Sequence, residues 1–305
     1  MGNISLVTEF ILLGLSRNHN QQVPLFAVFL TTYLVTVLGN GLIIAVISKD
    51  YELHTPMYFF LGNLSFVDIC FSSVTAPRML ANLLLEKKSI SFKACMTQLF
   101  FLFCTASMEC FILAIMAYDR LVAISNPLRY LSIMNSKTCL TLVGSSWALT
   151  SLHSLLHMVT VSTFTFCGPN QIHEYFCDLP PLLALSCSDT TSYDLLVFTE
   201  GSLIATSPFL FVVVSYSRIL KTILMIRSSS GQYRAFSTCS SHLLSVGLYF
   251  GTIFFTYFRP SSSGSVDDDR TITVVYSVLT PLLNPFIYSL RNQQVKGALK
   301  KMMCQ

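Results

Sequence analysis

Ionisable side chains are scarce in this sequence, and several of them interrupt long apolar runs. Lys, Arg, Asp and Glu make up 11% of the 305 residues, whereas about a quarter is usual for a soluble domain. Asp68, Glu109 and Glu200 each stand alone inside an apolar run, and Asp119 and Arg120 stand together at the end of one. An isolated charge is costly in an apolar environment, so these five residues are the first candidates for functional chemistry.

Asp68 and Glu109 fall near the middle of two successive apolar runs. Two carboxylates that meet in a low-dielectric core repel each other unless a cation or a proton lies between them. One interpretation is a small-cation site, most simply for Na⁺, that responds to the conformation of the protein. The other is a structural network of protonated or water-bonded carboxyl groups. The residues by themselves favour neither interpretation.

Asp119 and Arg120 lie where their apolar run ends. Adjacent residues of a helix diverge by about 100°, so the two side chains do not share a face. They could form a topological anchor with a surface ion pair. They could also form a latch, in which Asp119 restrains Arg120 in one state and releases it to a cytoplasmic partner in another. Composition leaves the two interpretations equal.

Two other polar features are weaker signals. Glu200 lies on the outer half of its run, where it could contact a ligand, but a protonated or water-facing structural carboxyl is favoured. Cys239 and His242 are three residues apart on one predicted helix and could bind a metal ion. Two ligands without a third are weak evidence for a metal site.

The elements that position these residues are seven long runs that carry at most one charge each. About 18 or more apolar residues suffice to cross a bilayer, and backbone groups in lipid must be satisfied within a helix. The sequence therefore predicts an all-α membrane protein, a seven-transmembrane helix bundle. The runs are residues 25–48, 55–77, 96–118, 138–166, 195–217, 235–258 and 271–290.

The sequence predicts a single domain, residues 1–305, with no internal repeat. We assign residues 1–23 to an extracellular segment, 24–290 to the helix bundle and 291–305 to a cytoplasmic tail. The tail combines basic residues with apolar ones at helical spacing, which is typical of a short amphipathic helix on the membrane surface. Its apolar positions are Val295, Leu299, Met302 and Met303.

The charges of the connecting segments predict the orientation of the bundle in the membrane. Lys and Arg concentrate in the connections after the first, third and fifth runs and in the tail, so this side is predicted to be cytoplasmic and the N-terminus extracellular. Asn3 begins a glycosylation sequon, which has meaning only on the outer side. Four cysteines also fall on the outer side, where disulfides form, and allow three pairings. They are Cys95, Cys167, Cys177 and Cys187.

Other function classes find little support. The cations form no dense basic stripe, so no nucleic-acid surface is expected. No arrangement of a nucleophile with a base stands out, so no enzymatic role is expected. A transporter would be expected to show repeated halves and broken helices at its substrate site, and no repeat is visible in this sequence.

Several long strings resemble the olfactory receptor family of the rhodopsin-like G-protein-coupled receptors, in its tetrapod-type (class II) branch. They span almost the whole chain in the expected order. They are PMYFFLGNLSFVDIC (residues 56–70), MAYDRLVAISNPLRY (116–130), SYSRIL (215–220), FSTCSSHL (236–243) and PLLNPFIYSLRN (281–292).

The resemblance implies an odorant receptor in the plasma membrane of olfactory sensory cilia, without a cofactor except a structural Na⁺. It implies disulfides Cys95–Cys177 and Cys167–Cys187, a cation site at Asp68 and Glu109, and a G-protein contact at Arg120 restrained by Asp119. Partners would be small, mostly apolar volatile odorants, a stimulatory G protein that raises cyclic AMP, and membrane lipid. Ligand-binding positions would be Leu102, Phe103, Ala106, Ser107, Ile204, Phe250, Ile253, Phe254, Tyr257 and Ser277.

The sequence departs from the family pattern at three places. Leu121 and Ser125 stand where the family usually has Tyr and Cys, and Tyr249-Phe250 reverses the usual Phe-Tyr order. Loss of a hydroxyl at Phe250 could remove a hydrogen bond of the activation switch, and Leu121 could weaken coupling. A related receptor for a non-odorant ligand is the nearest alternative, because its pocket would look the same.

Overall fold

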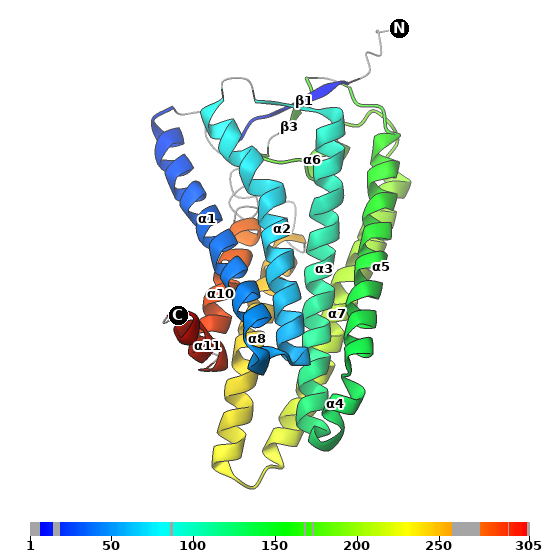
Figure 1. Cartoon of the computed structure of the whole chain (residues 1–305). Helices are drawn as coiled ribbons and strands as arrows, with labels where there is room; N and C mark the ends of the chain where they lie inside the picture. Colours follow the sequence, from blue (N-terminus) through cyan, green and yellow to red (C-terminus); the bar gives the residue numbers. More distant parts are fainter. Residues whose placement is uncertain are drawn as a thin grey trace.

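Long helices packed side by side make up most of the protein in a computed structural model (Figure 1). The structure describes residues 7–14, 19–85, 88–167, 169–172, 174–257, 275–291 and 293–303. The bundle consists of α1 (His19–Lys49), α2 (Pro56–Leu84), α3 (Phe92–Ser125), α5 (Ser136–Ser162), α7 (Thr191–Leu224), α8 (Ser229–Tyr257) and the π-helical turn η3 (Val275–Leu279), which continues into α10 (Thr280–Arg291).

Each predicted run has its helix in this bundle. Within the described residues, five helices are long and apolar enough by themselves to cross a membrane, namely α1, α2, α3, α5 and α7. The sixth run lies in α8, which has 29 residues, and the described part of the seventh run lies in η3 and α10.

Several helices extend past the charge-free runs, because a helix continues where polar side chains reach water or headgroups. α1 begins at His19, within the segment 1–23 that we assigned to an extracellular N-terminus, and α3 continues to Ser125. The start of α3 is set by Ser91, whose hydroxyl accepts a hydrogen bond from the backbone N–H of Ala94. A serine cap of this kind fixes the first turn of a helix.

A small sheet at one end of the bundle is absent from the all-α prediction. β1 (Glu9–Leu12) pairs antiparallel with β2 (Ser89–Ser91) and parallel with β3 (Gln171–Ile172). The side chains of Phe10 and Leu12 alternate inward and are fully buried. The sheet therefore ties the N-terminal segment to the loop between α5 and α7. Asn3 lies outside the described residues.

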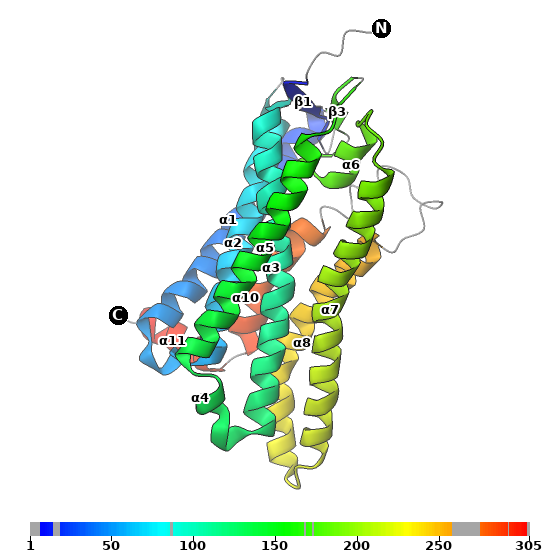
Figure 2. The same cartoon turned by 90° about the vertical axis from the view of Figure 1, so that its right-hand side faces the viewer.

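The loop between α5 and α7 also carries the short helix α6 (Leu179–Ala184). Figures 1 and 2 place α6 with β1 and β3 at the end of the bundle opposite α4 (Tyr130–Ile133). Two disulfides tether this loop: Cys95–Cys177 to the start of α3, and Cys167–Cys187 within the loop. Both are the pairings that the resemblance implies.

The opposite end contains the predicted amphipathic helix, α11 (Gln293–Met303), and the short turns η1 (Tyr51–Leu53) and η2 (Pro127–Arg129). Val295 and Ala298 are buried against the bundle, and Lys300 faces outward. The Nζ atom of Lys301 lies 3.6 Å from a carboxylate oxygen of Asp50. These contacts fix the tail helix beside the end of α1.

Helices α1 and α10 approach each other closely at Gly39, which has no side chain. A Cβ atom added at Gly39 of α1 would lie 3.2 Å from the Cβ of Pro285 in α10, so glycine permits the close approach. The side-chain amide of the adjacent residue Asn40 donates to the carbonyl of Pro281 across 3.0 Å. Because this carbonyl lies in the helix that Pro285 interrupts, Asn40 satisfies backbone polarity that the proline leaves unpaired.

Candidate functional site

A large cavity lies beneath α6 and has a volume of about 510 Å³. Its walls come mainly from α3, α7 and α8, and their side chains are mostly apolar, with polar groups such as Ser202 and Thr252 among them. Six of the ten predicted ligand-binding residues line this cavity. They are Leu102, Phe103, Ala106, Ser107, Ile204 and Ile253.

Two predicted residues lie elsewhere in the packing. Phe250 is 1% exposed, and its ring centroid lies 5.2 Å from that of Phe209. Phe254 packs on the same ring at 4.9 Å. These three rings pack α7 against α8, and neither Phe250 nor Phe254 is among the residues that line the cavity. The side chain of Tyr257 lies outside the described residues.

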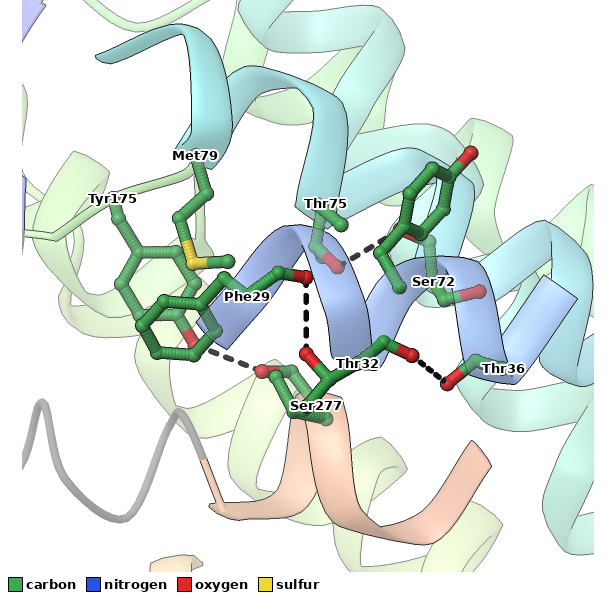
Figure 3. Close-up of a pocket in the computed structure, with 11 residues that line it drawn as sticks. Phe29, Thr32, Thr36, Ser72, Thr75, Met79, Tyr175 and Ser277 are labelled. Carbon is green, nitrogen blue, oxygen red and sulfur yellow. Dashed lines mark hydrogen bonds between the residues drawn. The ribbon is translucent and has the colours of Figure 1, made fainter. Parts of the chain in front are cut away.

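Ser277 lines a different and much smaller cavity, of about 10 Å³, between α1, α2 and η3 (Figure 3). Its hydroxyl is 2.8 Å from that of Tyr175, which comes from the loop between α5 and α7. A cavity of this size holds about one water molecule and no odorant. Ser277 therefore fastens the loop to the seventh helix in this structure.

Helix α6 forms the roof of the large cavity. The carboxylate of Asp178 accepts a hydrogen bond of 2.7 Å from the backbone N–H of Leu179 and so caps α6. Burial raises the pKa of Asp178 to about 6, and this hydrogen bond opposes the increase. The roof residues that line the cavity are Asp178, Leu179, Pro180 and Leu183.

The two carboxylates predicted as a cation site are buried together in the middle of the bundle. Asp68 is fully buried, and the side-chain amide of Asn284 donates to both of its oxygens, at 3.2 and 2.9 Å. Glu109 is 1% exposed, and its charge acts on that of Asp68. Its Oε1 atom and Oδ1 of Asn284 are buried without a hydrogen-bond partner. Oxygen atoms of this kind are ligands that Na⁺ accepts.

Asp119 is held by a partner that the sequence analysis did not name. Its Oδ1 accepts a hydrogen bond of 2.7 Å from the hydroxyl of Tyr130 in α4. Among the described residues, no nitrogen of Arg120 lies within ion-pair distance of Asp119. The expected Asp119–Arg120 contact is therefore absent here, because adjacent helix residues point about 100° apart and Asp119 faces the inner loop.

The charge of Arg120 acts not only on Asp119 but also on the inner ends of α7, α8 and α10. Its charge acts on Tyr216, Cys239 and Tyr288, one from each of these helices. The electrostatic energy of a cation that acts on three helices depends on the relative positions of those helices. The geometry therefore suits a switch element better than a simple surface anchor.

The Cys239–His242 pair does not form the metal site that was considered. Nδ1 of His242 lies 2.8 Å from the hydroxyl of Tyr216, and Nε2 lies 3.0 Å from the carbonyl oxygen of Leu113. The carbonyl can only accept, so Nε2 carries the hydrogen and Nδ1 accepts from Tyr216. Both ring nitrogens are thus occupied by α3 and α7.

Comparison with known proteins now decides the family. The sequence profile of the family described as "Olfactory receptor" matches residues 29–305. The chain belongs to the olfactory receptor family. It is 52% identical over 301 residues to a human protein named olfactory receptor 1F1, covering 99% of this chain and 96% of that protein. It is 50% identical, with the same coverage, to rat olfactory receptor 1f45 and to human olfactory receptor 1C1.

Membership confirms the predicted fold class and the predicted absence of an enzymatic role, and it supports odorant reception with coupling to a G protein. Members of this family are seven-helix membrane receptors. The cavity beneath α6 and Arg120 lie toward opposite ends of the bundle, and an odorant and a G protein are the two partners that the family implies. That the particular residues named above contact either partner remains a prediction.

The departures from the receptor pattern have local explanations. Leu121 packs with Ile219 and Ile223 of α7, so an apolar contact occupies the position where Tyr is usual. The hydroxyl of Tyr249 donates to the carbonyl of Ala106 across 2.5 Å. The reversed Tyr-Phe order therefore keeps a hydroxyl group on α8. This hydroxyl lies one residue earlier in the chain than in the usual order, and it is directed at α3.

Sequence reasoning missed two sets of residues around the receptor cavity. The sequence contains a signal for the roof helix α6, because Asp followed by Leu-Pro-Pro is typical of a helix start with proline in the first turn. The second set is His153, which lines the cavity, and His157, one turn further along α5. Two histidines four residues apart in a charge-free run share one helix face, and this spacing was the available signal.

Proposed function

We propose that this chain is a receptor for small, mostly apolar volatile odorants, which bind in the cavity beneath α6. The observation that carries the proposal is the cavity itself. Its volume of about 510 Å³ is within the range of small-molecule sites, and its lining combines many apolar side chains with a few polar ones. Burial supplies the affinity for such a ligand, and one or two hydrogen bonds orient it.

The polar groups that line the cavity suggest how a ligand is oriented. Ser107 of α3, Ser202 of α7 and Thr252 of α8 come from three different helices. An odorant oxygen bonded to one of them would connect ligand position to the spacing of the helices. A ligand shifts the receptor only by its difference in affinity between the resting and active arrangements.

We further propose that the inner end couples to a stimulatory, olfactory-type G protein and raises cyclic AMP. Arg120, whose charge acts on residues of α7, α8 and α10, would contact the G-protein α subunit. This arrangement requires the N-terminus and α6 outside the cell and α11 on the cytoplasmic face. The distribution of Lys and Arg supports that orientation. Residence in the plasma membrane of olfactory cilia, with lipid around the apolar helix faces, belongs to the same proposal.

Cyclic AMP in cells that express the full chain tests this function. The cells carry a surface tag, and a broad panel of volatiles is applied to the wild type and to Arg120→Ala at equal surface density. A dose-dependent response that Arg120→Ala loses supports the proposal. A second variant, Leu140→Phe, changes an exposed side chain of α5 away from the cavity and should respond as wild type. Silence of well-expressed wild type across the panel argues against volatile odorants.

Asp68 and Glu109 are proposed to hold a Na⁺ ion. The support is the pair of unpartnered buried oxygens, Glu109 Oε1 and Asn284 Oδ1, beside the Asp68 carboxylate. The ion would offset one of the two negative charges and so reduce the repulsion between the carboxyl groups in the core. Asp68, Glu109 and Asn284 come from α2, α3 and α10, so binding would hold these three helices in one arrangement.

Thermal unfolding of the purified receptor in NaCl and in choline chloride at equal ionic strength tests the ion site. Na⁺ should raise the midpoint for wild type, because a ligand that binds only the folded state stabilises it. Asp68→Asn and Glu109→Gln should remove the dependence on Na⁺. A salt effect that is the same for both salts contradicts the proposal.

A further inference from the structure

Three potential metal ligands converge at the outer ends of α5 and α7. Nε2 of His153 and Nε2 of His157 are 2.9 Å apart, and Oε2 of Glu200 lies 3.8 and 3.5 Å from them, respectively. Within the described residues, this is the one group of three His, Cys, Asp or Glu ligand atoms close enough to share an ion. None of the functions argued above uses it.

We propose that His153, His157 and Glu200 bind a transition-metal ion of the Zn²⁺ type. Imidazole nitrogens suit Zn²⁺ and its neighbours in the first transition row, whereas an all-oxygen site such as that of Asp68 and Glu109 suits Na⁺. The proposal does not depend on odorant binding, because it concerns the metal alone.

The distances fit a tetrahedral ion. With Zn–N bonds of about 2.0 Å, two ligand atoms of a tetrahedral site lie about 3.3 Å apart. The three observed separations, 2.9, 3.5 and 3.8 Å, bracket that value. Small rotations of the side chains would equalise them. Three protein ligands leave a fourth position for water or another donor.

The helix geometry brings the ligands together without a loop. His153 and His157 are four residues apart on α5, so both rings lie on one face of the helix. Glu200 comes from the facing helix α7. A bound ion would therefore join two helices that border the cavity, and His153 lines the cavity itself.

The neighbouring side chains orient the two histidine rings as metal ligands require. Nδ1 of His157 lies 2.8 Å from the hydroxyl of Tyr193, so the ring can donate there and direct its Nε2 lone pair toward Glu200. Hydrogen bonds of this kind fix the tautomer of a ligating histidine. The ring centroid of Phe103 lies 6.4 Å from that of His153 and 5.4 Å from that of His157. The ring therefore covers both histidines and limits access of water from that side.

The protein groups by themselves leave the cluster incompletely satisfied. A histidine pair that shares one Nε2 hydrogen between its rings has none left for the carboxylate. Accordingly, Oε2 of Glu200 is shielded from solvent and has no hydrogen-bond donor in the described structure. A cation that accepts a lone pair from each ligand would satisfy all three atoms at once. A proton on Glu200 is the competing solution, and the experiment separates the two.

Metal binding is measured on the purified full chain in lipid nanodiscs after treatment with a chelator. Zn²⁺ is titrated by calorimetry, and Co²⁺ is used as a spectroscopic probe of tetrahedral coordination. We expect one saturable site, with a rise in the unfolding temperature at saturating Zn²⁺. Glu200→Gln and His153→Asn should each weaken Zn²⁺ binding by about a hundredfold or more and remove the tetrahedral Co²⁺ absorption.

Two further variants give the design its controls. Tyr193→Phe keeps all three ligands and should weaken Zn²⁺ binding by about tenfold, because it removes the hydrogen bond that orients the ring of His157. His54→Ala removes an exposed histidine beside η1, distant from the cluster, and should bind as wild type. Each variant is first shown to have the wild-type unfolding temperature without metal within a few degrees. Saturable Zn²⁺ binding that survives Glu200→Gln and His153→Asn unchanged, or no saturable binding to wild type, overturns the proposal.

Discussion

Tyr130 donates a hydrogen bond of 2.7 Å to Oδ1 of Asp119 and so joins the inner end of α3 to the loop that follows it. Burial and the neighbouring carboxylate raise the pKa of Tyr130, so its hydroxyl remains a donor at physiological pH. Asp119 is 1% exposed and its other oxygen has no hydrogen-bond partner. Tyr130 is therefore the hydrogen-bond partner of this buried carboxyl, and Arg120 adds an attraction between charges without a direct contact.

Tyr130→Phe should lower the free energy of unfolding by about 1.5–3 kcal/mol, the value of a hydrogen bond to a charged group. Arg120→Ala should change it by less than about 0.5 kcal/mol, because no ion pair with Asp119 is lost. Unfolding of the purified receptor by heat measures both, with Tyr51→Phe, an exposed phenol on the same side, as control. Equal destabilisation by Tyr130→Phe and Arg120→Ala would instead support a latch between Asp119 and Arg120.

A larger side chain at Gly201 should narrow the range of accepted ligands. Gly201 lines the cavity, and a Cβ atom there would meet nothing within 4 Å. Gly201→Leu should therefore fold normally, gain about 0.5–1 kcal/mol of helix stability and fill part of the cavity. We expect the cyclic AMP response to bulky odorants to fall at least tenfold in potency, while small odorants are less affected.

Gly144→Leu is the matched control for Gly201→Leu. Gly144 also has nothing within 4 Å of an added Cβ, but it lies on an exposed face of α5 away from the cavity. Its replacement should leave odorant potencies unchanged. A uniform loss of response in both glycine variants would point to folding or expression, and no loss in either would exclude Gly201 from the ligand's surroundings.

The sequence predicts elements that depend on local patterns and misses those that depend on pairing between residues far apart in the chain. The bundle could be predicted, because seven charge-free runs and the amphipathic spacing of Val295 and Leu299 are local patterns. The sheet could not, because β1 has four residues and its partners β2 and β3 lie about 80 and 160 positions away. A strand that short has no periodic signal of its own.

The same distinction applies to the site. Asp68 and Glu109 stood out because each is a lone charge in an apolar run, and both are buried in the core as expected. Ser277, in contrast, meets Tyr175 of a distant loop, and Asp119 meets Tyr130 on a separate helix. Those partners depend on how the loops fold back on the bundle, which spacing along the chain does not encode.

Phe250→Tyr should destabilise the receptor, although it adds the hydroxyl that the family usually has at this position. Phe250 is 1% exposed and packs against the rings of Phe209 and Phe254. A hydroxyl buried there without a partner costs about 1–3 kcal/mol. Thermal unfolding should show the loss, whereas Phe236→Tyr, at an exposed position of the same helix, should be neutral. A gain in stability or signalling would mean that the new hydroxyl finds a switch partner.

The stability of the roof should depend on pH through Asp178. Burial raises the pKa of this carboxyl to about 6, above its ordinary value of 3.8. The folded state therefore binds the proton more tightly than the unfolded chain does. As pH rises from about 4 to above 6, the unfolded chain releases this proton first, and the folded state loses stability.

The measurement is the unfolding temperature of the purified receptor at pH 5 and at pH 7.5, for wild type and Asp178→Asn. Wild type should lose about 1 kcal/mol over this interval, because part of the shift acts below pH 5 and the side chain keeps part of its exposure. Asp178→Asn keeps an oxygen that can cap α6 but does not titrate, so its loss should be smaller. If the variant and wild type show the same pH dependence, other groups control it and the burial of Asp178 has no thermodynamic consequence.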